Sequence, residues 1–210
     1  MSRDKTLFDH ELSDSLGESN TVSKQLANQL FDFFRNNPLF KWEQANNDCE
    51  DRANAVCILL EQWKVSCLKA WVFSGCFLKK GEGQLINNWN YHVAAAIPVN
   101  VEGNRSYYII DPATLNEINN IEFWAANVTA FAHSHYLVKA AETYIFNAPT
   151  ITKENWHKRN RQNYKWTIQG LAGINGVTKT GKAELVFKKA LIKNTANAFQ
   201  QLMQDKPLFL

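Results

Sequence analysis

The sequence predicts an α+β fold, in which helices flank an antiparallel sheet. Three observations support this prediction. Apolar side chains recur at helical spacing near both ends of the chain. Three segments in the middle are strand-like, and turn residues at 101–104 join the last two into a hairpin. The predicted helices are 21–36, 49–63, 119–131, 153–168 and 183–204, and the predicted strands are 66–73, 89–99 and 106–111.

Composition places the chain among globular proteins. Its 210 residues suit one domain, or one domain with an appendage, and 45% are hydrophobic and 20% charged. These values exclude a wholly disordered or fibrous chain. The first twenty residues lack the apolar core of a signal peptide, and no apolar run approaches the roughly 18 residues of a membrane span. We therefore expect a soluble protein that is delivered by dedicated secretion machinery into a host or competitor cell, or a domain excised from a larger protein.

The predicted organisation has three parts: a polar arm at 1–20, a core domain at 21–148 and a basic helical extension at 149–210, packed on or appended to the core. Pro149 marks the second boundary. From residue 150 onward, the sequence contains eleven lysines and arginines but only three acidic residues. Such a surface can attract nucleic acid, an anionic membrane or an acidic protein, although a solvated helical face is the commoner explanation. We expect no nucleic acid partner and no membrane span, and a protein partner or target held by this part.

The four cysteines fit neither a zinc site nor a redox pair. Cys49, Cys57, Cys67 and Cys76 are 8, 10 and 9 residues apart, which matches no metal-binding motif. Cys57 falls on the apolar face of its helix and is expected in the core. Cys67 and Cys76 can form a disulfide only in an oxidising compartment. Cys49 is different, because it stands where a helix begins.

The start of that helix both favours and opposes a thiolate. Asp48 is the expected N-cap, and Asp51 gives a pair similar to a capping box. The unpaired backbone N–H groups and the helix dipole favour a negative sulfur on Cys49. Glu50 and Asp51 oppose it. They are turned by roughly 100° and 200° around the helix axis from Cys49, so they can point to solvent, where Arg52 can pair with them.

His92 and Asp111 are the candidates for partners of this cysteine. The midpoint of 92 and 111 lies at the edge of the predicted turn, so the hairpin places the two side chains opposite each other on one face of the sheet. Asp111 would then fix the tautomer of His92 and stabilise its protonated form. The order cysteine, histidine, aspartate along the chain is that of papain-type and transglutaminase-type sites.

Three motifs resemble those of the bacterial protein-glutaminase (protein-glutamine deamidase) family. Residues 48–53 (DCEDRA) resemble its cysteine-bearing helix start, 89–94 (WNYHVA) its W-x-Y-H-V-A strand, and 108–112 (YIIDP) its I-I-D-P strand end. The resemblance covers about 37–125. It implies a transglutaminase-like (papain-like) α+β core with the nucleophile at a helix N-terminus packed on an antiparallel sheet. It also implies deamidation of glutamine in a protein or peptide substrate, with Cys49 as nucleophile, His92 as general acid and base, and Asp111 as the residue that orients it.

This chemistry needs neither a metal nor an organic cofactor, because a thioester carries the acyl group. The Cys49 backbone N–H would hold the oxyanion, with a second donor from Asn47 or Trp42. Trp89 and Tyr91 flank His92 in the sequence, and we expect them either to line the substrate channel or to pack in the core. A transglutaminase or a cysteine protease with the same triad, and a non-catalytic binding protein on this fold, remain alternatives, and a toxin or effector role fits a chain without a leader.

Overall fold

We describe the protein from a computed structural model, which covers residues 21–43, 48–73, 89, 91–129, 136–144, 163–173 and 181–210. The predicted arm, all of residues 74–88 and the beginning of the helix predicted at 153–168 lie outside these ranges. No helix within them is both long and apolar enough to span a membrane. The elements in chain order are β1 (Val22–Ser23), α2 (Lys24–Asn36), α3 (Cys49–Gln62), β2 (Leu68–Phe73), β3 (Tyr91–Val101), β4 (Asn104–Ile110), β5 (Asn119–Asn120), α4 (Ile121–Thr129), β6 (Leu137–Ala140), α6 (Asn163–Leu171) and α7 (Lys182–Gln204).

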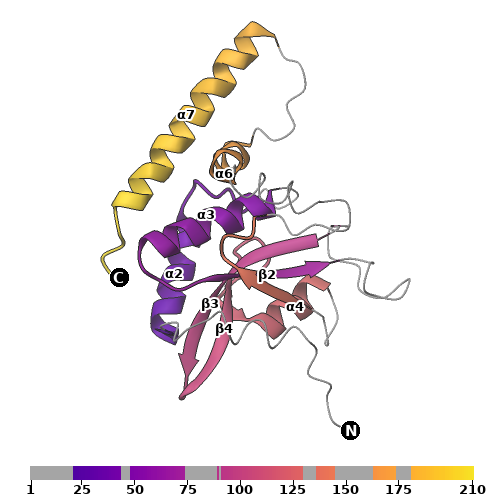
Figure 1. The fold of residues 1–210 in the computed structure, drawn as a ribbon, viewed down its shortest axis with the longest axis vertical. Coiled ribbons are helices and arrows are strands. Elements are labelled where there is room, and N and C mark those ends of the chain that lie inside the picture. Colours follow the sequence, from indigo (N-terminus) through magenta and orange to yellow (C-terminus); the bar gives the residue numbers. More distant parts are fainter. Residues whose placement is uncertain are drawn as a thin grey trace, which may run out of the picture.

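A sheet in the order β5-β4-β3-β2-β6 forms the centre of the molecule (Figure 1). All pairs along this path are antiparallel, and the short β1 pairs parallel with the end of β3. β3 is buried along most of its length, and its run Ala94-Ala95-Ala96 is buried on both faces. Small side chains at the middle of the central strand let helices approach the sheet closely on either side. The predicted combination of helices with an antiparallel sheet is confirmed.

The hairpin turn between β3 and β4 lies at residues 101–104, as the sequence predicted, but its centre is one residue beyond the midpoint of 92 and 111. Glu102 and Gly103 both have positive φ, 52° and 82°, as a two-residue hairpin turn requires. The register therefore pairs Val101 with Asn104 and Ala95 with Ile110. Extending this register would place Asp111 opposite position 94, two residues from His92 and on the same sheet face. The expected directly opposed pair is thus a diagonal one.

Helix α3 lies between the sheet and α6, which explains why few of its residues are exposed. Ala55, Val56, Leu59 and Leu60 join the main core, as does Cys57, whose predicted core position is confirmed. On the other side, α6 packs against α3 at Gly170, where a side-chain methyl group would overlap the carboxylate of Asp51. A helix enclosed in this way holds its first residue in a fixed position.

A buried polar network ties the C-terminal extension to the core. Lys69 on β2 is fully buried, and its Nζ donates to Asn54 Oδ1 at 2.6 Å and to the Thr143 carbonyl at 2.9 Å. Asn54 on α3 in turn donates to Thr167 Oγ1 on α6 at 2.9 Å. Burial lowers the pKa of Lys69. Removing one member would leave buried polar groups unpaired, so α6 and α3 behave as one packed unit.

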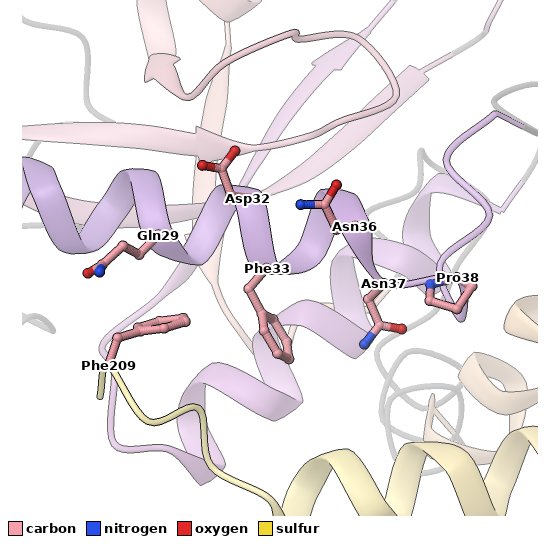
Figure 2. A pocket seen from close by; sticks show the side chains of 7 residues that line it. All are labelled: Gln29, Asp32, Phe33, Asn36, Asn37, Pro38 and Phe209. Carbon is pink, nitrogen blue, oxygen red and sulfur yellow. The ribbon is translucent and has the colours of Figure 1, made fainter.

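The end of the chain returns to α2. The ring of Phe209 packs against Phe33 with centroids 6.3 Å apart. Figure 2 shows both rings at a hollow of about 460 Å³, whose lining also includes Gln29, Asp32, Asn36, Asn37 and Pro38. This hollow is lined by α2, the residues that follow it and the chain end, and by none of the residues predicted to carry chemistry.

Candidate active site

The structure brings His92 and Asp111 together in the interior. His92 Nε2 lies 2.8 Å from Asp111 Oδ2, and the two residues are 1% and 2% exposed. His92 belongs to β3, whereas Asp111 directly follows β4. The diagonal placement set by this register still permits the contact, because a diagonal pair on one sheet face remains within reach of long side chains.

Asp111 accepts hydrogen bonds from three side chains. Besides His92, Trp124 Nε1 on α4 donates to its Oδ2 at 2.9 Å, and the hydroxyl of Thr114 donates to the same oxygen. Burial by itself would raise the pKa of this carboxyl group. The positive charge of protonated His92 and the three hydrogen bonds outweigh burial, so the pKa of Asp111 lies below its ordinary value. A carboxylate held ionised in this way stabilises the imidazolium form of His92.

Trp124 and Thr114, which contact Asp111, were not among the site residues predicted from the sequence. The sequence did hold a signal for Thr114, because it stands three residues after Asp111 and a tight turn at that spacing brings a hydroxyl back to a carboxylate. The structure contains this turn, in which the backbone N–H of Thr114 donates to the Asp111 carbonyl. Trp124 carried no local signal, since only the docking of α4 against the sheet brings its indole to Asp111.

The imidazole of His92 is held between two indoles, with one nitrogen unengaged. Trp89 stacks on it with centroids 4.4 Å apart and an interplanar angle of 18°, and Trp124 lies tilted at 5.9 Å. Nε2 is occupied by Asp111, whereas Nδ1 is buried and has no hydrogen-bond partner within the described part of the chain. Nδ1 is therefore the atom of His92 that is available to exchange a proton with a reacting group.

Cys49 is the first residue of α3, as the sequence predicted. Asp48 before it takes the N-cap position with a left-handed backbone, φ 65°, although its side chain makes no capping hydrogen bond. The Cys49 side chain packs against a buried cluster of Ala53, Trp71 and Val93, and Tyr91 packs against the same cluster. The backbone N–H of Val93 hydrogen-bonds to the sulfur. The sulfur thus lies beside the residue that follows His92 on β3, while no hydrogen bond between Cys49 and His92 is found among the described residues.

The acidic residues after Cys49 do not point to solvent, contrary to the prediction. Glu50 Oε2 lies 3.4 Å from Cys49 Sγ, and its carboxylate also accepts a hydrogen bond from Tyr91. Asp51 is fully buried beneath α6 and accepts a hydrogen bond from the Tyr144 hydroxyl. The prediction treated α3 as a helix with one free side, and the packing of the C-terminal extension removes that side.

The electrostatic balance at Cys49 favours the thiol in this conformation. Burial is the largest effect, and the negative charge of Glu50 acts in the same direction. The Val93 N–H and the charge of Arg52 act in the opposite direction but do not compensate, so the pKa of Cys49 lies well above its ordinary value. Burial and Glu50 also raise the pKa of Tyr91, which therefore remains a neutral hydrogen-bond donor.

The remaining predicted site residues are placed as follows. Trp42 stacks on Phe40, and its Nε1 donates to the Phe34 carbonyl at 2.7 Å, so this N–H is engaged at the end of α2 and does not act as an oxyanion donor here. Asn47 lies outside the described residues. Trp89 stacks on His92, and Tyr91 faces Cys49 and Glu50. The backbone N–H of Cys49 has no intrahelical acceptor, as for any residue at this helix position.

The described residues contain no group of three or more histidine, cysteine or acidic side chains arranged to hold a metal ion. The arrangement at hand instead combines a thiol at a helix start, a buried imidazole with one open nitrogen and a carboxylate behind it. This set can perform acyl transfer through a cysteine nucleophile.

Comparison with known proteins identifies the family. A family model described as Glutaminase matches residues 26–128, the stretch that holds Cys49, His92, Asp111 and Trp124. These residues form a glutaminase-family domain. The match confirms the resemblance stated from the three motifs, and it confirms the enzyme class, a hydrolase of the glutamine side-chain amide. The α+β class predicted for this domain is confirmed by its helices and antiparallel sheet.

Two solved structures are similar to this chain. One is the NMR structure of protein-glutaminase from Chryseobacterium proteolyticum, with 19% identity over 77% of this chain and 95% of that one and a TM-score of 0.49. The other is a crystal structure of a mutant pro-protein-glutaminase, with 19% identity over 72% of this chain and 62% of that one and a TM-score of 0.48. No curated protein matches the chain.

Proposed function

We propose that the glutaminase domain deamidates glutamine side chains of proteins or peptides, with Cys49 as nucleophile, His92 as general acid and base, and Asp111 as its orienting partner. The observation that carries the proposal is the open Nδ1 of His92, which lies in a buried imidazole fixed at Nε2 by an ionised carboxylate. The sulfur of Cys49 contacts the neighbouring residue on the same strand. The proposed nucleophile therefore lies beside the strand that carries the proposed proton acceptor.

The reaction begins with transfer of the Cys49 proton to His92 Nδ1. The thiolate attacks the side-chain carbonyl carbon of glutamine, and the carbonyl oxygen becomes an oxyanion that the Cys49 backbone N–H stabilises. His92 Nδ1 then gives its proton to the departing nitrogen, so that ammonia leaves and a thioester remains. Water loses a proton to Nδ1 and attacks the thioester, which releases glutamate and regenerates Cys49.

The position of Glu50 controls the first step, the transfer of the Cys49 proton to His92. Its carboxylate contacts the sulfur and disfavours the thiolate. Proton transfer to His92 therefore requires that Glu50 move away from Cys49 or lose its charge. Tyr91 donates a hydrogen bond to Glu50 in the observed position. We assign this contact to the resting enzyme.

A single assay tests the reaction. The protein is incubated with a peptide that contains one internal glutamine, in the presence and absence of a primary amine, and the products are weighed. Deamidation adds about 1 Da, because OH replaces NH₂, and releases one equivalent of ammonia. An isopeptide product would assign a transglutaminase, and a cut chain would assign a protease. An unchanged peptide that binds without reaction would assign a binding protein.

The deamidase, transglutaminase and protease share the thioester, so only the fate of the acyl group separates these three enzymes. The family match favours hydrolysis of the amide over aminolysis or peptide cleavage. We further propose that the enzyme acts as a toxin or effector on a protein of another cell, which rests on the sequence alone. Detection of a deamidated glutamine at a defined position of a target protein would be direct evidence for this role.

A further inference from the structure

The beginning of α7 exposes apolar side chains where a surface helix would carry polar ones. Leu185, Val186 and Phe187 are 46%, 67% and 66% exposed. Figure 1 shows this end of α7 extending past α6, away from the sheet. Large apolar side chains gathered at one place on a surface commonly mark an interaction site.

The exposed residues form a ridge with a defined shape. At 100° per residue, Val186, Phe187 and Ala190 share a sector of about 100° on α7. We call these three residues the apolar ridge. The side chains that attach α7 to the core, Ile192, Thr195 and Phe199, point to the opposite side of the helix. The apolar ridge is therefore not the face with which α7 packs on its own domain.

The charges beside the apolar ridge are mostly positive. Lys189 and Lys193 are exposed along the edge next to Val186. At the other edge, Lys188 forms an ion pair with Glu184 at 2.5 Å. Residues 182–193 contain four lysines and one glutamate, a net charge of +3. Two copies of this segment would repel each other, whereas an acidic surface would complement it.

We propose that the apolar ridge with Lys189 and Lys193 is a docking surface for acidic protein substrates of the glutaminase domain. A short helical ridge of this kind fits an apolar groove with an acidic rim. Only about two turns of α7 are free, which is a small apolar area for binding a lipid surface. Through its second half, α7 packs on α6 and α3, and α3 begins with Cys49. A substrate held on the ridge would raise the effective concentration of its glutamines at the nucleophile.

The kinetic part of this inference rests on the proposed deamidation, and three peptides test it. A core peptide carries one glutamine between neutral residues. An acidic peptide adds a Gly-Ser linker of about 20 residues, with a root-mean-square length of about 25 Å, and an amphipathic segment of leucine and glutamate. A basic peptide has lysine in place of glutamate. The wild-type protein should deamidate the acidic peptide with kcat/KM about tenfold above the core and basic peptides, mainly through KM.

Two double variants locate the effect. Val186→Ser with Phe187→Ser should remove the advantage of the acidic peptide. Lys189→Glu with Lys193→Glu should transfer the advantage to the basic peptide. The core peptide should react at the wild-type rate in all three proteins, which also shows that the variants are folded. Equal rates for the three peptides with the wild-type protein, or parallel losses on all three in the variants, would overturn the proposal.

Direct binding separates docking from catalysis. The Cys49→Ala protein should bind the fluorescein-labelled acidic peptide in an anisotropy titration, and the two double variants in that background should not. If the wild-type protein binds this peptide but releases no ammonia from any peptide, the docking surface stands and the deamidation fails. If the apolar ridge binds anionic phospholipid vesicles and not the peptide, the proposal is wrong. It is also wrong if sedimentation velocity detects a dimer whose interface buries the apolar ridge.

Discussion

Glu50 Oε2 lies 3.4 Å from Cys49 Sγ, so the residue next to the proposed nucleophile opposes its ionisation. The contact has a second partner, because Tyr91 donates to the same carboxylate. The mechanism proposed above needs a thiolate, whereas this contact holds a negative charge against the sulfur. This relationship makes the protonation of Cys49 the property through which the site can be tested most readily.

Glu50→Gln should lower the pKa of Cys49 toward its ordinary value, because Glu50 is one of the groups that raise it. The sign follows because removal of a neighbouring negative charge favours the thiolate. The measurement is the pH dependence of Cys49 alkylation by iodoacetamide, followed by peptide mass so that Cys57, Cys67 and Cys76 are scored separately. Glu117→Gln, a change at an exposed position near the N-terminus of α2, is the matched control and should leave the profile unchanged. An unshifted profile in Glu50→Gln would show that Glu50 does not contact the sulfur in solution.

Asp111→Asn should reduce the rate of deamidation on the order of 10³-fold or more, because the amide neither fixes the His92 tautomer nor supports its charge. His92→Ala should be at least as damaging. Because the two residues act as one unit, the double variant should cost little more than the worse single variant. Ammonia release measured for the four proteins gives the cycle, and fully additive losses in log rate would mean that the pair does not work as proposed.

The same substitution changes the pH dependence of stability. The pKa of Asp111 is below its ordinary value in the folded protein, so its ionised form stabilises the fold above about pH 4, the unfolded value. This stabilisation is lost as the pH falls through the folded pKa. The free energy of unfolding in urea, measured from pH 6 down to pH 3, should therefore fall less steeply in Asp111→Asn than in the wild-type protein. Parallel curves would mean that Asp111 has the same pKa in the folded and unfolded chain.

Gly170→Ala tests the packing of α6 on the nucleophile helix. The new methyl group meets the buried Asp51 carboxylate, so the free energy of unfolding should fall by about 1–3 kcal/mol. Gly181→Ala, where a methyl group would meet nothing within 4 Å, is the matched control and should lose only a few tenths of a kcal/mol. Urea unfolding measures both. Equal stability of the two variants would indicate that α6 does not press on Asp51.

Local patterns predicted the parts of the site that lie on single elements. The cysteine at a helix start and the hairpin turn at 101–104 both followed from the sequence, whereas His92 and Asp111 form a diagonal pair and not the directly opposed pair that was expected. The environment of each residue was not predictable in this way. The hydrogen bond from Trp124 and the burial of Asp51 depend on how α4 and α6 dock, and no periodicity within one segment encodes that docking.

Glu50 shows the same limit most clearly. Its angular position on an isolated helix allowed it to face solvent. In the folded chain, Tyr91 and the thiol of Cys49 offer a hydrogen-bonding environment at the helix start, and the carboxylate turns toward them. A prediction from the helix alone could not include partners supplied by β3.

The most direct test of the deamidation is the mass of one glutamine peptide after incubation with the wild-type protein and with Cys49→Ala. We expect a gain of about 1 Da and one equivalent of ammonia with the wild-type protein, and neither with Cys49→Ala. The circular dichroism spectrum and the unfolding midpoint of Cys49→Ala should match those of the wild-type protein, which shows that the variant is folded. Ammonia release that persists in folded Cys49→Ala, or a peptide left unchanged by the wild-type protein, would contradict the assignment of Cys49 as the nucleophile of a glutamine deamidase.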